Sequence, residues 1–146
     1  MKKILLIIGV LSFVLLTACS RGQEVEEGQT PASYEQVREH YETITYHLDF
    51  LLGAFGDEVA TIELTRDADL IVTVNDEQFI DFLLEAKIDA HVAGVVRDTF
   101  VMLSDDIVNA HELFGVAVKI FTRENTQPFL IVQNGEVVEE NFEQID

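Results

Sequence analysis

Hydrophobic residues recur at steps of three and four over residues 33–55, which is typical of an amphipathic helix. The apolar positions of this stretch are Val37, Tyr41, Ile44, Leu48, Leu51 and Leu52. Ser33 is followed three residues later by Gln36, which is the spacing of a capping box. Gly53 and Gly56 are typical of a helix end. The pattern therefore predicts a helix that begins after Ser33 and ends at these glycines.

The hydrophobic period then changes to two, which is typical of β-strands. Apolar and polar residues alternate over 59–65 and again over 70–75. The four residues 66–69 form a short connection between these stretches. Because short connections favour antiparallel neighbours, the two strands are expected to form a hairpin.

The middle of the chain returns to helical spacing. Asn75 or Asp76 is expected to cap a helix whose apolar stripe continues without a break to about Leu103. The Ser-Asp-Asp triplet at 104–106 resembles a fresh N-cap. It therefore predicts a second, short helix that ends before Gly115.

Three more strands are predicted over 116–120, 129–133 and 136–142. Asn134-Gly135 separates the last two, and this dipeptide is a strong signal for a hairpin turn. The element order predicts an α+β domain: an antiparallel sheet of about four to five strands, containing two hairpins, with helices packed on one face. The opposite face is expected to be solvated or to bind a partner, and it carries Thr61, Glu63, Thr65, Lys119 and Arg123.

The chain begins with the parts of an export signal: two lysines, an apolar run over 4–16, and small residues before Cys19. The apolar run is shorter than the roughly 20 residues that a permanent membrane span needs. The motif Leu16-Thr17-Ala18-Cys19 resembles the lipobox of bacterial lipoproteins, and the resemblance covers residues 1–19 only.

The resemblance implies that residues 1–18 are a signal peptide that is removed and that a diacylglyceryl lipid is attached to the Cys19 thiol. The lipid would anchor the protein to the bacterial cell membrane on its extracytoplasmic side. The alternative is an ordinary signal with a coincidental cysteine. Residues 19–33 are expected to be a lipidated, flexible, acidic tether, and residues 34–146 are expected to be a single globular domain.

The chain carries 27 acidic and nine basic residues, a formal charge of −18. Loss of the signal removes Lys2 and Lys3 and leaves seven basic residues against 27 acidic ones, a formal charge of −20. Such a charge argues against nucleic-acid binding, which uses basic patches, and against electrostatic docking on anionic lipid. Solubility explains it, and adaptation to a saline or alkaline exterior is the alternative.

Familiar catalytic signatures are missing from the sequence, so no enzymatic activity and no cofactor other than the covalent lipid are expected. His40 and His47 lie seven residues apart, about 10.5 Å along a helix, which is too far to share one metal ion. His91 and His111 lie in other helical segments and could join a site only through the tertiary fold. No metal site is therefore predicted.

The phenylalanines lie almost wholly on predicted core faces, at positions 50, 55, 79, 82, 100, 114, 121, 129 and 142. The leading hypothesis is a non-enzymatic lipoprotein whose domain binds another protein or an envelope component. A small-ligand or cation-binding lipoprotein is the second hypothesis, and an enzyme with an unrecognised site is the third.

Overall fold

The computed structural model describes residues 30–145. The predicted signal peptide, the lipobox with Cys19, and residues 20–29 of the predicted tether lie outside the described residues. The first described helix, α2, spans Tyr34–Leu52 and begins with the expected capping box. The Gln36 amide donates to Ser33 Oγ at 3.3 Å, and the Ser33 amide donates to Gln36 Oε1 at 2.8 Å. The short 3₁₀ helix η1, Gly53–Phe55, follows where the glycines predicted the end.

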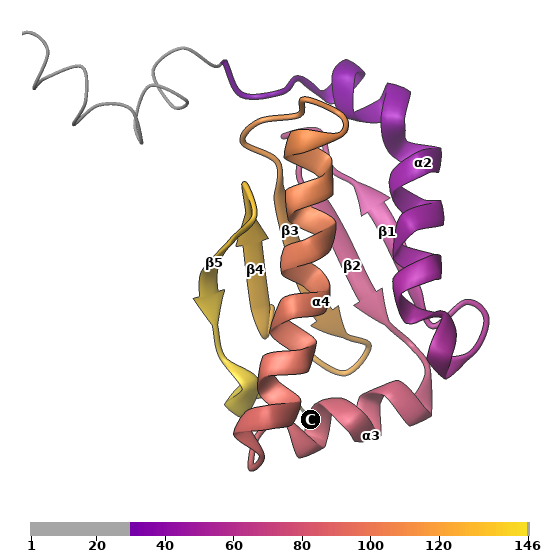
Figure 1. Cartoon of the computed structure of the whole chain (residues 1–146), viewed down its shortest axis with the longest axis vertical. Coiled ribbons are helices and arrows are strands. Elements are labelled where there is room, and N and C mark those ends of the chain that lie inside the picture. Colours follow the sequence, from indigo (N-terminus) through magenta and orange to yellow (C-terminus); the bar gives the residue numbers. More distant parts are fainter. Residues whose placement is uncertain (1–29, 146) are drawn as a thin grey trace, which may run out of the picture. The chain divides into compact units, whose positions relative to one another are not determined.

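A five-stranded sheet forms the second layer (Figure 1). Its strands are β1 (Ala60–Leu64), β2 (Leu70–Val74), β3 (Ala117–Thr122), β4 (Leu130–Gln133) and β5 (Glu136–Glu140), and they lie side by side in this order. The predicted hairpins β1–β2 and β4–β5 are both present. The predicted α+β class is therefore confirmed.

One strand pair differs from the expected antiparallel sheet. β2 and β3 run parallel, with Val72 opposite Ile120. Parallel neighbours need a long crossover between them, and the helices α3 (Glu77–Glu85) and α4 (Ala90–Asn109) supply it.

Two predictions for the helices between β2 and β3 are wrong. The apolar stripe expected to run unbroken to Leu103 is divided between α3 and α4, and Asp89 caps α4 by accepting from the His91 amide at 2.8 Å. Ser104 is not an N-cap, because α4 continues through it to Asn109. Both helices present apolar residues at the same spacing, so periodicity alone did not reveal the break. Asp76, one of the two expected caps, caps α3.

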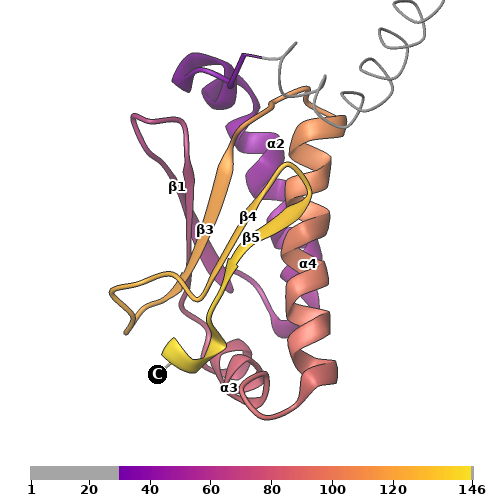
Figure 2. The ribbon, with the colours of Figure 1, turned by 90° about the vertical axis from the view of Figure 1, so that its left-hand side faces the viewer.

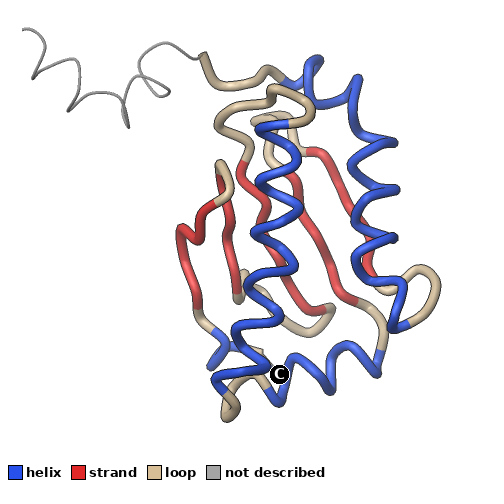
Figure 3. The backbone as a smooth tube through the Cα atoms, in the orientation of Figure 1, coloured by secondary structure: helices blue, strands red, loops and turns tan. Residues whose placement is uncertain are grey.

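The helices α2 and α4 cover one face of the sheet, and α3 crosses below its end (Figures 1 and 2). Figure 3 shows the same division between helices and strands. The core lies between these layers, and its largest buried side chains include Phe79, Phe100 and Phe129. The prediction that phenylalanines lie in the core is wrong for Phe50, which is exposed, and for Phe114 and Phe121, which are half-buried outside the core.

The opposite face of the sheet is solvated, as expected. Thr61, Glu63 and Arg123 are exposed, and Thr65 and Lys119 are partly exposed. Over residues 30–145, none of the helices combines the length and the hydropathy that a membrane crossing requires.

Candidate functional site

A groove between α2 and the C-terminal end of α4 brings two histidines and an aspartate together with exposed aromatic side chains. It has a volume of about 500 Å³, and we call it the α2–α4 groove. It is lined by Thr43, Tyr46, His47, Phe50, Asp106, Ala110 and His111. A neighbouring hollow of about 420 Å³ shares His47, Asp106 and Ala110 with the groove and adds Met102, Asp105 and Asn109.

The two helices place these residues through their buried faces. On α2, Ile44 and Leu48 are buried in the core, so His47 lies at the flank of that face and only half-buried. On α4, Leu103 and Ile107 are buried, and Asp106 is therefore held at the corresponding flank. His111 follows directly after Ala110, the C-cap of α4.

The polar part of the groove centres on one carboxylate oxygen. Asp106 Oδ2 lies 2.9 Å from His47 Nδ1 and 3.6 Å from His111 Nε2. Because an ionised carboxylate only accepts hydrogen bonds, His47 donates to it through Nδ1. His111 Nε2 is buried and has no hydrogen-bond partner. The His40 and His111 rings are 4.8 Å apart between centroids and tilted by 39°.

The apolar part of the groove is unusually open to solvent. Tyr46 is 74% exposed, Phe50 is 73% exposed, and Met102 in the neighbouring hollow is 57% exposed. We call these three side chains the apolar rim. Single exposed hydrophobic residues are ordinary, but several around one groove are typical of interaction sites. None of the residues that line the groove or its neighbouring hollow is a lysine or arginine.

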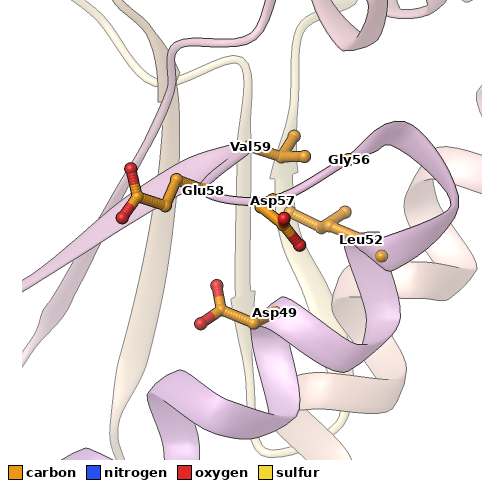
Figure 4. A pocket seen from close by; sticks show the side chains of 7 residues that line it. Asp49, Leu52, Gly56, Asp57, Glu58 and Val59 are labelled. Carbon is orange, nitrogen blue, oxygen red and sulfur yellow. The ribbon is translucent and has the colours of Figure 1, made fainter.

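A second hollow, of about 170 Å³, lies where α2 ends and the loop before β1 begins. Figure 4 shows Asp49 on α2 and Asp57 and Glu58 on the loop. It has no histidine or cysteine among its lining residues. Within residues 30–145, no group of three or more His, Cys, Asp or Glu side chains could hold a metal ion. The lining of this hollow is therefore acidic, but it does not form a metal site.

One shifted pKa lies on the side of α4 that contacts β5. The pKa of Arg97 is raised above its ordinary value, chiefly by its hydrogen bonds with Glu140, whose Oε2 accepts from Arg97 Nε at 2.9 Å. This pair joins α4 to β5 and takes no part in the groove. Its effect is structural, because arginine stays charged at any physiological pH.

The fold brings two of the histidines of α2 into contact with residues far away in the sequence. His40 and His47 are two helical turns apart on α2; α4 places Asp106 against His47, and the turn after α4 places His111 against His40. His91 is exposed near the start of α4 and is not among the groove residues. Asp106 was expected to take part in a helix cap, so no local signal pointed to its role in the groove.

Comparison of the chain with protein-family models, with curated proteins and with solved structures finds no match.

Proposed function

We propose that this protein is a lipid-anchored extracytoplasmic protein, without enzymatic activity, that docks a protein partner through the α2–α4 groove. The observation that carries the docking proposal is the apolar rim, because Tyr46 and Phe50 remain exposed in the groove and Met102 remains exposed in the hollow beside it. The anchor rests on the lipobox resemblance at residues 16–19.

The rim side chains stay in water in the folded chain, so their burial by a partner would contribute to the free energy of binding. Burying a phenylalanine-sized apolar side chain is worth about 1.5–3 kcal/mol. Aromatic residues also dominate the energetics of many protein interfaces. Phe50 and Tyr46 keep roughly three quarters of their surface in water, so a partner could bury most of it.

The charge around the rim defines the chemistry of the partner. Asp106 lines the groove and Asp105 lines the neighbouring hollow, and neither of these has a lysine or arginine among its lining residues. The complementary surface is an apolar side chain flanked by lysine or arginine. The strongly negative charge of the whole chain would speed the approach of such a partner.

Metabolic labelling with a clickable fatty acid tests the anchor. Cells that express the wild-type chain are compared with cells that express Cys19→Ala. The wild type should carry the label and remain with the membrane fraction, whereas Cys19→Ala should lose both properties. Label that persists in Cys19→Ala would contradict the anchor.

A photo-crosslinking amino acid at position 50 of the full chain tests docking in living cells. We expect one discrete adduct from position 50 and none from position 138, because Val138 is exposed on β5, outside the groove. Replacing Tyr46 and Met102 with serine should remove the adduct.

The serine replacements should change the free energy of unfolding by less than about 0.5 kcal/mol, since the replaced side chains are exposed. This separates loss of docking from loss of folding. An adduct that survives in the folded serine variant would rule out the rim as the docking surface.

A further inference from the structure

We propose that protonation of His47 and His111 below neutral pH switches off docking in the α2–α4 groove. The inference rests on the proposed docking function, and it concerns the regulation of that same groove. Histidine is the side chain whose charge ordinarily changes between pH 5 and 8, and two histidines line the groove. The pH of the surroundings would therefore decide whether the groove attracts or repels a basic partner.

The lining of the groove changes the sign of its formal charge when both histidines are protonated. Among the described residues that line the groove, Asp106 is the only acidic one, and none is a lysine or arginine. With neutral histidines the lining therefore carries one negative charge, and two added protons give it one positive charge. The neighbouring hollow contributes the further negative charge of Asp105 in both cases. Two protons are therefore enough to remove the net attraction for lysine or arginine.

The hydrogen bond of His47 leaves one ring nitrogen that can take up a proton. His47 Nδ1 donates to Asp106 Oδ2 at 2.9 Å, so Nε2 of the neutral ring carries no proton and is an acceptor. The His47 side chain is 26% exposed, so solvent can deliver a proton to it. Protonation keeps the hydrogen bond to Asp106 and makes it charge-assisted, which is the stronger form.

His111 provides the second observation, because its Nε2 is buried and has no hydrogen-bond partner. This nitrogen lies 3.6 Å from Asp106 Oδ2, just beyond hydrogen-bond distance. A protonated imidazole donates from both nitrogens, so His111 Nε2 would then donate to the same carboxylate after a small rotation. Asp106 would lie between two positively charged rings and would no longer be free to pair with a lysine or arginine of the partner.

The other titratable groups near these histidines do not change the direction of the effect. From α2, the His40 ring lies 4.8 Å from the His111 ring between centroids, and a proton on His40 would add to the positive charge. From α4, Asp105 accepts a hydrogen bond from Asn109 at 2.8 Å in the neighbouring hollow. Glu112 follows His111 in the turn after α4 and is exposed. Carboxylates ordinarily stay ionised between pH 5 and 8, so the imidazoles are the groups whose charge changes here.

Photo-crosslinking from position 50 of the full chain tests the switch in living cells. The cells are suspended in medium buffered at about pH 7.5 or about pH 5.5 before irradiation, because histidine charge changes between these values. We expect an adduct at the higher pH that is at least about tenfold weaker at the lower pH, since like charges across an interface exclude a partner.

The ratio of the two adduct yields shows whether the groove histidines cause this dependence. In the double variant His47→Gln, His111→Gln the ratio should fall close to one, because glutamine has no charge at either pH. His91→Gln is the matched control, since His91 is exposed and lies outside the groove. It should keep the wild-type ratio.

Nitrogen-15 chemical shifts of the histidine rings in the purified full chain, in detergent, follow the protons without any partner. His47 and His111 should both gain a proton over the same pH range. Circular dichroism at both pH values confirms that each variant is folded, and the single variants replace a double variant that is not. The switch alone is overturned by a His111 ring that stays neutral at the lower pH, by equal wild-type yields at the two pH values, or by a folded variant that keeps the wild-type ratio. A wild type that gives no adduct at either pH overturns the docking function as well.

Discussion

Ser104→Ala tests whether the buried hydroxyl in the C-terminal half of α4 holds the β4–β5 turn. Ser104 is 1% exposed, and its Oγ accepts a hydrogen bond from the Gly135 amide at 2.9 Å. Loss of a partner costs a buried amide about 1–3 kcal/mol, and the half-buried position of Gly135 places the cost near the lower end. Alanine returns up to about 0.5 kcal/mol through its better helix propensity. The expected net loss of unfolding free energy is therefore about 1 kcal/mol.

Urea unfolding of the full chain in detergent measures this loss, and Thr99→Ala is the matched control. Thr99 also lies in α4, but its hydroxyl donates only to the Val95 carbonyl of the same helix. Thr99→Ala should therefore be neutral or slightly stabilising, which separates the two variants by about 1.5 kcal/mol. The Gly135 amide should also exchange with solvent faster in Ser104→Ala. Equal free energies for the two variants would refute the tie between α4 and the turn.

Three further substitutions are checked by the same unfolding measurement. Leu103→Ala removes a fully buried side chain and should cost about 2–5 kcal/mol; a loss below 1 kcal/mol would contradict its place in the core. Asp89→Ala removes the N-cap of α4 and should cost about 1 kcal/mol, whereas Asp89→Asn should retain most of that stability. Gly115→Ala should cost at least about 1–2 kcal/mol, because Gly115 has a φ of +80° and a Cβ there would lie 3.1 Å from Pro31 Cβ; an unchanged midpoint would show that the segment around Pro31 yields.

The elements that local rules determine were predictable from the sequence. The capping box at Ser33 marked the start of α2, and the Asn134-Gly135 turn, with φ values of 53° and 76°, joins β4 and β5 as expected. Alternating residues located the strands because one face of the sheet is buried and the other is wet.

Features that depend on tertiary packing were not predictable. Helix α4 starts anew after α3 because Asp89 caps its N-terminus. Asp89 is one of many aspartates in an acidic chain, so the sequence gave no distinct signal for this cap. The parallel pairing of β2 with β3 requires knowing that the two crossover helices return β3 beside β2. Serine is a common helix cap, yet the Ser104 hydroxyl instead accepts a hydrogen bond from the Gly135 amide in the β4–β5 turn.

The histidines show why the groove could not be predicted from the sequence. A local search tests whether two histidines on one helix can share an ion, and His40 and His47 fail that test. The groove instead combines α2 with residues far along the chain: Asp106 lies 59 positions after His47, and two strands and helix α3 separate α2 from α4. The buried residues of α2 and α4 that pack in the core determine which flanking residues face each other. A polar cluster of this kind arises from the packing of two amphipathic helices, and no short motif in the sequence indicates it.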